Sequence, residues 1–397
     1  MSRSAPVPHR SLSWFILLAG SLAVSALTVA AEEPGGAAVP PNRLTSNREL
    51  EDRLTPLLQK HNVPGIVGGV IENGQLTAVA SVGLRKAGSP EPITINDKLH
   101  LGSNTKAMTA TLLARLVEEK RMTWESTIGD IFSDLKPAPH PDYRNVTVIQ
   151  LLSHRAGLPA NTAWWSLGKG SRVQQRQRLL ETILVEPPLH PPDSKFLYSN
   201  VGYVIAGHMA EKVTGKSWED LMVEYLFKPL KMPSAGFGIP GSIGKVDQPW
   251  GHQITDGKEK ALQIDNAPAL GPAGTVHCSL PDWSHFVGMH LEGARGTSQF
   301  LTPGSFQVLH TPVSGDEFAC GWVVTDRKWA NGTVLTHTGS NTIWFAMAWI
   351  APELNAAFLA VVNHGDESGR SACDAAVVEL IGYHKDQVNR RVPSADQ

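Results

Sequence analysis

The first regular pattern in this chain is a set of apolar residues at helical spacing. Two strand-like runs follow it. Leucines between residues 50 and 58 recur three and four positions apart and therefore fall on one face of a helix. The runs 65–71 and 76–82 are rich in β-branched and other apolar residues, and Asn73 and Gly74 stand between them. An Asn-Gly pair between two such runs is a strong signal for a tight hairpin. The N-terminal part of the pattern thus predicts a helix followed by a β-hairpin.

Between about 105 and 270 the pattern becomes helical and rich in loops. An apolar stripe over 112–117 has helical spacing, and proline-rich breaks at 137–141 and 187–192 separate the pieces. This stretch predicts several short helices rather than a sheet.

Beyond residue 315 the strand-like pattern returns, at 333–337, 342–350 and 356–362. The middle run is apolar on both faces, which is typical of a central buried strand. A helix is expected from about 373 to 381, and the polar end of the chain is expected to fray.

Strands at both ends of the chain with helices between them predict a two-part domain over residues 46–385. We expect the α/β (α+β) class: an antiparallel sheet flanked by helices, built from about 46–104 and 271–385, with a helical subdomain over about 105–270 inserted into it. Residues 386–397 form a polar tail.

The first 31 residues have a composition unlike the rest. Arg3 and Arg10 precede an apolar run, and Val29, Ala30 and Ala31 place small residues at its end. A basic head, a short apolar middle and a small-residue end are typical of a secretory signal peptide. We therefore expect a periplasmic or secreted protein with a flexible Pro- and Gly-rich leader over 32–45, and no stable membrane insertion after cleavage. A retained membrane anchor is the alternative, because the run could nearly span a bilayer.

Charge and cysteine content narrow the function classes. The 397 residues carry a formal net charge of −2 and no run of five like charges, so the concentrated basic face that nucleic acid requires is absent from the sequence. The three cysteines, Cys278, Cys320 and Cys373, are too few for a disulfide framework. Buried free thiols are the favoured interpretation, and a single bridge remains open. The sequence does not predict an oligomeric state.

Ser103 and Lys106 form the first candidate for chemistry. Ser103 stands where a loop enters a predicted helix, and Lys106 follows one turn later on the same face. A serine hydroxyl needs a base to become a nucleophile, and a lysine amine can serve when burial lowers its pKa. The spacing alone is also compatible with a plain helix cap and a solvated lysine.

Two further elements lie downstream. In an extended segment Tyr198 and Asn200 project to the same side. A phenol beside an ammonium could lose its proton more readily and act as a base, while the Asn200 amide could hold a substrate amide or orient a lysine. The alternative is that Asn200 caps a helix and Tyr198 fills space. Residues 337–340 then end a strand, where the missing side chain of Gly339 would let a substrate backbone approach a sheet edge.

Together these elements resemble the three motifs of the penicillin-recognising serine hydrolases: Ser103-Asn104-Thr105-Lys106, Tyr198-Ser199-Asn200 and His337-Thr338-Gly339. Within that superfamily the chain looks like the class C β-lactamase-like branch, which also contains DD-peptidases, esterases and D-amino-acid peptidases. Segments 151–159, 227–232 and 271–274 also resemble the family, and the resemblance covers about 48–385.

The resemblance implies a role for each matching residue. Ser103 would be the nucleophile, with Lys106 and Tyr198 as the proton-transfer pair, acting through an acyl-serine intermediate without metal or cofactor. Backbone N–H groups of Ser103 and Ser340 would form the oxyanion hole. The substrate would be a small molecule or peptide with an amide or ester bond.

The substrate-binding residues match the family less closely. Asn200 and Asn161 would hold the acyl-side amide, although the family's β-lactamases usually carry Gln at the position of Asn161. His337 stands where those β-lactamases have lysine. Thr338, Gly339 and Ser340 follow it and complete the expected substrate-binding segment. A histidine is mostly neutral at pH 7 and attracts a substrate carboxylate less. We therefore expect carboxypeptidase or esterase activity rather than efficient β-lactam hydrolysis.

Other function classes find little support. The sequence has no G-x-S-x-G elbow and no His-Glu-x-x-His helix, which argues against an α/β-hydrolase and a zinc hydrolase. The remaining alternative is a non-catalytic module of the same fold that binds peptidoglycan or a β-lactam.

Overall fold

The computed structural model describes residues 44–313 and 315–391. The predicted signal peptide at 1–31 lies outside the described residues, as do residues 32–43 of the predicted leader. The described residues from Thr45 to Arg391 belong to one compact unit, and the fold below is theirs. No helix in this part of the chain is long and apolar enough to cross a membrane.

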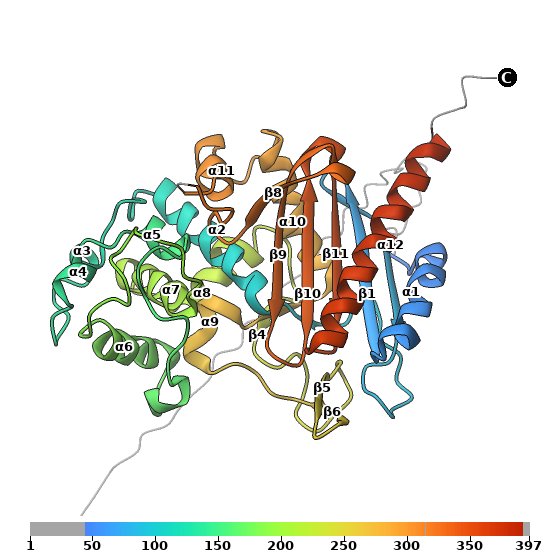
Figure 1. The fold of residues 1–397 in the computed structure, drawn as a ribbon, viewed down its shortest axis with the longest axis horizontal. Helices are drawn as coiled ribbons and strands as arrows, with labels where there is room; N and C mark the ends of the chain where they lie inside the picture. Colours follow the sequence, from blue (N-terminus) through green and yellow to red (C-terminus); the bar gives the residue numbers. More distant parts are fainter. Residues whose placement is uncertain (1–43, 314, 392–397) are drawn as a thin grey trace, which may run out of the picture. The chain divides into compact units, whose positions relative to one another are not determined.

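A six-stranded antiparallel sheet in the order β2-β1-β11-β10-β9-β8 forms the centre of the α/β part (Figure 1). Its strands are β1 (Gly65–Glu72), β2 (Gln75–Gly83), β8 (Val323–Arg327), β9 (Gly332–Ser340), β10 (Phe345–Ala351) and β11 (Ala356–Val362). Strand β1 pairs with β11 from Ile66 opposite Val362 to Glu72 opposite Ala356. The two ends of the chain therefore meet in one sheet, and the predicted fold class is confirmed.

Helices cover both faces of this sheet, because successive strand residues point to opposite sides. Ile66 packs in the cluster that contains residues of α1 (Arg48–His61) and α12 (Glu367–Arg391), whereas Val67 belongs to the cluster on the side of α10 (Leu280–Ala294). Figure 1 shows α12 lying across one face of the sheet with α10 behind it. Continuous burial of β1 and β11 follows from this two-sided cover.

The inserted part consists mainly of helices packed around the buried helix α2. They are α2 (Thr105–Glu118), α3 (Ile128–Ile131), α4 (Pro141–Arg144), α5 (Val148–Leu152), α6 (Arg172–Ile183), α7 (Asn200–Thr214), α8 (Trp218–Met222) and α9 (Gly271–Gly274), with α11 (Pro303–His310) packed beside α2. Ser or Thr side chains cap the N-termini of α3, α5 and α6 in capping boxes, which satisfies backbone donors at the start of each helix.

The predicted helical part over 105–270 is not purely helical. It contains the hairpin β5 (Gly251–Thr255) and β6 (Lys258–Leu262), and β4 (Gly236–Phe237) joins β3 (Leu99–His100) and β7 (Val276–Cys278) in a small sheet. The hairpin is tied to the α/β part, because the backbone N–H of His252 donates to Ile343 O at 3.0 Å and its ring Nδ1 lies 2.7 Å from Asn363 O. These long-range contacts place the hairpin with a part of the fold that is distant in sequence.

Helix α12 is longer than the helix predicted over 373–381. It runs to Arg391 and so includes residues 386–391 of the predicted frayed tail. Ion pairs hold this last segment, since Asp386 accepts from Arg53 at 2.6 Å and Arg391 donates to Glu72 at 2.9 Å. The prediction of a frayed end was wrong for residues 386–391, because the polar sequence of this segment does not reveal its ion pairs with α1 and β1.

Two local predictions are confirmed. Asn73 and Gly74 adopt positive φ angles of 52° and 76° in the turn between β1 and β2, as a two-residue hairpin turn requires. The three cysteines are free and buried, so the alternative of a single disulfide is wrong in this structure.

Candidate active site

Ser103 lies in a tight turn, Gly102–Asn104, directly before α2. Gly102 has φ +51°, and a Cβ there would stand 2.4 Å from the backbone nitrogen of Ser340. A Cβ on Gly339 would stand 2.7 Å from the backbone nitrogen of Ser103. The two glycines therefore allow the turn and the end of β9 to touch, which brings the backbone amides of Ser103 and Ser340 side by side.

Lys106 is fully buried beneath this turn. Its Nζ lies 3.2 Å from Ser103 Oγ, 2.7 Å from Asn200 Oδ1 and 2.8 Å from the carbonyl oxygen of Ala273. Among the ion pairs of the described residues, none involves Lys106. Burial without a carboxylate lowers the pKa of Lys106 well below 10.5.

The contacts of Lys106 fit a neutral amine. Such an amine has two N–H bonds, which the oxygens of Asn200 and Ala273 can accept, and one lone pair. In the neutral form that lone pair faces the third neighbour, the hydroxyl of Ser103, whereas in the ammonium form a third N–H donates to this hydroxyl. The alternative of a solvated lysine is excluded, and Lys106 is placed to take the hydroxyl proton.

Tyr198 meets the same hydroxyl from another side. Its phenol is hydrogen-bonded to Ser103, and Lys106 Nζ lies 4.8 Å from the centroid of its ring. Burial raises the pKa of Tyr198 to about 12, against a smaller opposing effect of the Ser103 hydrogen bond. The sequence-based expectation of a phenol whose pKa is lowered by an ammonium is therefore not met. In the free protein Tyr198 keeps its proton, and Lys106 is the stronger candidate for the base.

Asn200 links the lysine to the open side of the site. It is the first residue of α7, whose cap is the side chain of Ser199 rather than Asn200. The Asn200 oxygen accepts from Lys106, and its Nδ2 donates to Asn161 Oδ1 at 2.8 Å. The structure thus brings both predicted asparagines to one hydrogen-bonded row that ends in the cleft.

His154 supports the Tyr198 segment, a role that the sequence did not assign to it, although it lies in the segment 151–159 that resembles the family. Its Nδ1 accepts from the backbone N–H of Ser199 at 3.0 Å, and its ring lies 4.3 Å from that of Tyr198. Burial lowers the pKa of His154 well below 6.5. A histidine 44 residues before Tyr198 carries no local pattern that would reveal this contact.

The third motif contributes less to the open surface than the sequence suggests. His337 is buried, with Nδ1–H donating to Gly321 O at 2.6 Å. Burial lowers the pKa of His337 to about 3, so the ring is neutral at pH 7. Ser340 lines the cleft, whereas His337, Thr338 and Gly339 are not among its lining residues.

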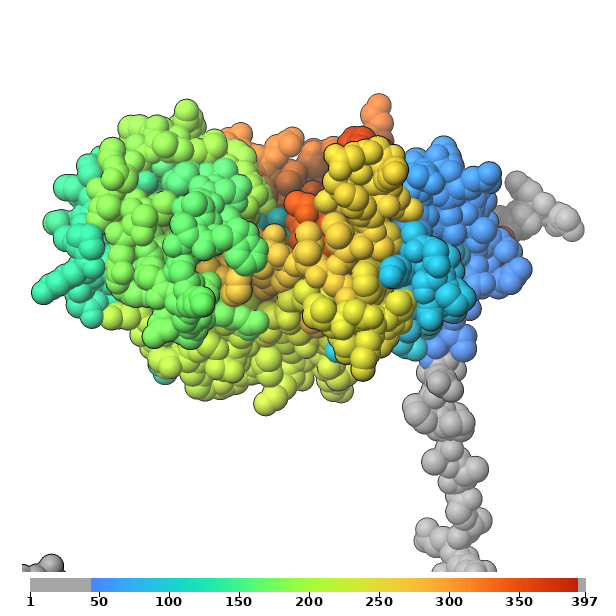
Figure 2. Space-filling view, turned by 90° about the horizontal axis from the view of Figure 1, so that it is seen from below, coloured from blue at the N-terminus to red at the C-terminus, as the bar shows by residue number. Residues whose placement is uncertain are grey.

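The cleft above Ser103 has a volume of about 350 Å³. Figure 2 shows the molecule hollowed between the green segment around 150–200 and the yellow segment around 240–265. Lining residues that the sequence did not single out include Trp164, Trp165, Asp265, Asn266 and Thr342. Trp344, four residues after Ser340, is 1% exposed and packs in the core. Within the described ranges no three His, Cys, Asp or Glu side chains gather as metal ligands.

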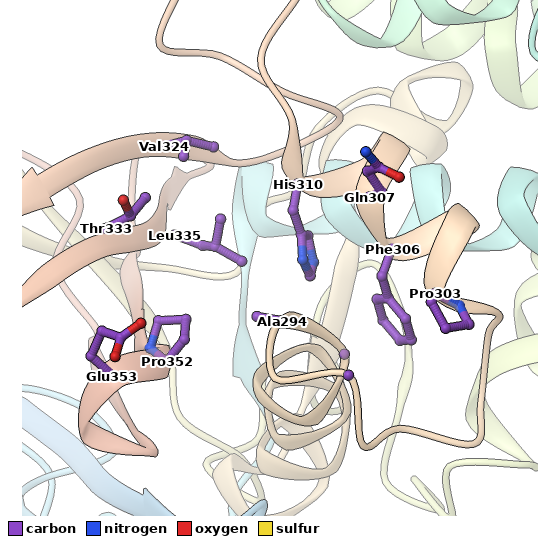
Figure 3. A pocket seen from close by; sticks show the side chains of 12 residues that line it. Ala294, Pro303, Phe306, Gln307, His310, Val324, Thr333, Leu335, Pro352 and Glu353 are labelled. Carbon is purple, nitrogen blue, oxygen red and sulfur yellow. The ribbon is translucent and has the colours of Figure 1, made fainter.

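A second cavity, of about 440 Å³, lies among α10, α11, β8 and β9 (Figure 3). His310 points into it, and its Nε2 lies 2.8 Å from Nδ1 of the buried His290. None of its lining residues is a serine or a lysine. This cavity therefore lacks the groups for acyl transfer that converge at Ser103.

Comparison with known proteins is consistent with this geometry. Residues 50–381 match the model of the family described as Beta-lactamase. Penicillin-binding protein 4 of Amycolatopsis lactamdurans is 27% identical over 292 residues, 72% of this chain and 74% of that protein. The Unguisins hydrolase ungD of Aspergillus violaceofuscus (strain CBS 115571) is 25% identical over 60% of this chain, which spans only 44% of that protein. An octameric penicillin-binding protein homologue from Pyrococcus abyssi has the same fold, with a TM-score of 0.70, 21% identity, and coverage of 84% of this chain and 77% of that one.

Proposed function

Because the chain belongs to the Beta-lactamase family, whose members are serine hydrolases, we propose that it hydrolyses an ester or amide bond through an acyl intermediate on Ser103. The observation that carries the proposal is the buried Lys106 amine, 3.2 Å from Ser103 Oγ and without a carboxylate partner. A buried cation without such a partner is costly, so the neutral base is favoured before substrate arrives.

Each step follows from the placement of these groups. Ser103 Oγ attacks the substrate carbonyl carbon while its proton passes to Lys106 Nζ. The negative charge on the carbonyl oxygen is stabilised by the adjacent backbone N–H groups of Ser103 and Ser340. Tyr198, hydrogen-bonded to Ser103, donates a proton to the leaving group and is reprotonated from Lys106. Water then attacks the acyl ester with the same groups as base and acid, which releases the acid and restores Ser103.

The charge of the cleft favours substrates without a carboxylate. His337 is neutral, and none of the described residues that line the cleft is Lys, Arg or His. β-Lactams and C-terminal peptide substrates present a carboxylate, which gains little attraction here. We propose a small ester or a D-amino peptide as substrate, with nitrocefin turnover far below that of a dedicated β-lactamase.

Export is part of the same proposal. The composition of residues 1–31 is typical of a signal peptide, so the mature protein should begin near residue 32 in the periplasm or outside the cell. Intact-mass measurement of the protein from the exported fraction tests this. An uncleaved N-terminus would favour the membrane anchor.

Labelling with an uncharged fluorophosphonate tests the nucleophile. The purified protein should gain one adduct by intact mass, and peptide mapping should place it on Ser103. Ser103→Ala should abolish the adduct, whereas the exposed Ser242→Ala variant should retain it. A folded protein without any adduct would instead support the non-catalytic binding module.

A further inference from the structure

Asp265 is the ionisable side chain of the cleft that the proposed reaction does not use. It lines the cleft together with Ser103, and its side chain is only 12% exposed. Its Oδ1 lies 2.8 Å from Nε2 of His100, a ring that is fully buried. A half-buried carboxylate at a reaction cleft needs either a cation within the protein or one from outside.

The hydrogen bonds of His100 show that this ring does not supply the cation. Its Nδ1 accepts from the backbone N–H of Gly102 at 3.1 Å, so Nδ1 carries no proton. The single ring proton is on Nε2 and is donated to Asp265, which makes the ring neutral. The pair of His100 and Asp265 therefore keeps the full negative charge of the carboxylate.

No other protein group neutralises that charge. Among the residues that the structure describes, Asp265 forms no ion pair with Lys or Arg, and its Oδ2 receives no hydrogen bond. Asp97 offers a contrast, since its more deeply buried carboxylate is held by two hydrogen bonds from Arg85, at 2.6 and 2.9 Å. The carboxylate of Asp97 is paired with an arginine of the fold, whereas the carboxylate of Asp265 faces the cleft without such a partner in the described part of the chain.

The position of Asp265 places this charge close to the reacting atoms. Asp265 is connected through His100 to Gly102, the residue before the nucleophile. Its neighbour Asn266 donates to Gly274 O at 2.7 Å, next to Ala273, whose carbonyl oxygen accepts from Lys106. A positively charged group of a substrate bound at Ser103 can therefore reach Asp265 without leaving the cleft.

We infer that the substrate carries a positively charged amine close to its scissile carbonyl, and that Asp265 is the residue that selects it. This inference rests on the proposed acyl transfer at Ser103 and adds the charge class of the substrate. The attraction between the substrate amine and Asp265 is already present when the substrate binds. The preference for cationic substrates should therefore appear mainly as a lower KM.

Three p-nitrophenyl esters of nearly equal acyl length test the inference on the purified full chain. They are the β-alaninate, which carries an ammonium, the butyrate, its neutral isostere, and the succinate monoester, which carries a carboxylate. We expect kcat/KM for the β-alaninate to exceed that for the butyrate by about tenfold or more, with the succinate lowest. A second pair, butyrylthiocholine and its neutral 3,3-dimethylbutyl analogue, places the positive charge on the leaving group instead.

Asp265→Asn separates charge from shape, because the amide oxygen can still accept from His100. In this variant the ratio of kcat/KM for the β-alaninate to kcat/KM for the butyrate should fall below about threefold. Asp256→Asn removes the same charge from an exposed turn, where the side chain is 89% exposed, and should leave the preference intact.

The possible outcomes are distinct. An unchanged cationic preference in Asp265→Asn, or a parent that favours the uncharged or anionic substrate over the cationic one in both series, overturns the inference while leaving the hydrolase intact. Failure of every ester together with failure of fluorophosphonate labelling overturns the proposed function itself, and the inference with it.

Discussion

Two long basic side chains, Lys106 and Arg176, are fully buried within residues 44–313 and 315–391, and their surroundings differ in one respect. Arg176, on α6, forms ion pairs with Glu211 of α7 and Glu219 of α8 and donates to Ala269 O at 3.2 Å. Lys106, on α2, is surrounded by an amide oxygen, a carbonyl oxygen and a hydroxyl. One region supplies carboxylates to a buried cation, and the other supplies only neutral acceptors.

The comparison shows that a buried basic side chain can either stabilise the fold or serve as a reactive base, depending on whether carboxylates surround it. At Arg176 the charges compensate one another: burial alone would raise the pKa of Glu211, but the hydrogen bond with His208 and the charge of Arg176 hold it below its usual value. The cluster therefore joins three helices as a fixed ionic contact. At Lys106 burial without a carboxylate lowers the pKa of the amine, which favours a base next to Ser103.

Removal of the base should have the largest effect. Lys106→Met keeps the volume of the site but removes the proton acceptor, so we expect Ser103 acylation to slow by about 10²- to 10⁴-fold. Single-turnover kinetics with p-nitrophenyl butyrate measure this rate. Near-normal acylation in a folded variant would show that Lys106 is not the base.

Removal of the structural cation should affect stability instead. Arg176→Met leaves two buried carboxylates without their partner, and we expect the free energy of unfolding to fall by about 3–5 kcal/mol. The activity of the remaining folded protein should change little. Arg172→Met is the matched control, because this arginine is about half exposed and 3.7 Å from Glu219, and it should cost at most about 1 kcal/mol. Equal losses in both variants would contradict the proposed role of Arg176.

Asn200→Asp should give Lys106 a carboxylate partner, as Arg176 already has. It places a carboxylate at the position 2.7 Å from Nζ, which favours the ammonium and should raise the pKa of Lys106. The pH–rate profile for acylation should shift to higher pH by the same amount. Asn200→Ala removes the amide without adding charge and should lower the rate without that shift. A profile that does not move would argue against a neutral Lys106.

The pH dependence of stability gives a smaller effect of defined sign. Because the folded pKa of Lys106 is lowered, the unfolded chain binds a proton that the folded chain lacks between that value and 10.5. The free energy of unfolding attributable to Lys106 should therefore increase as pH rises through this window. Chemical denaturation of the parent and Lys106→Met between pH 6 and 9 measures the difference, in which the parent should gain relative to the variant. A constant difference would mean that the two states bind the proton alike.

Local pattern predicted much of this fold, and contacts between distant segments account for what it missed. The Asn73-Gly74 turn and the buried run at 356–362 follow from residues adjacent in sequence, and the spacing of Ser103 and Lys106 places them on one face of a turn. The carbonyl of Ala273, the ring of His154 and the carboxylate of Asp265 reach the same site from separate segments. These groups come together only in the folded structure, and their spacing in the sequence does not predict that they meet.

The most direct test of the neutral lysine is the pH dependence of Ser103 labelling by an uncharged fluorophosphonate. We predict that the labelling rate rises with an apparent pKa well below 10.5 and levels off above it, and that Lys106→Met loses this rise. A rate that climbs tenfold per pH unit up to pH 10, or a variant with an unchanged profile, would contradict the account.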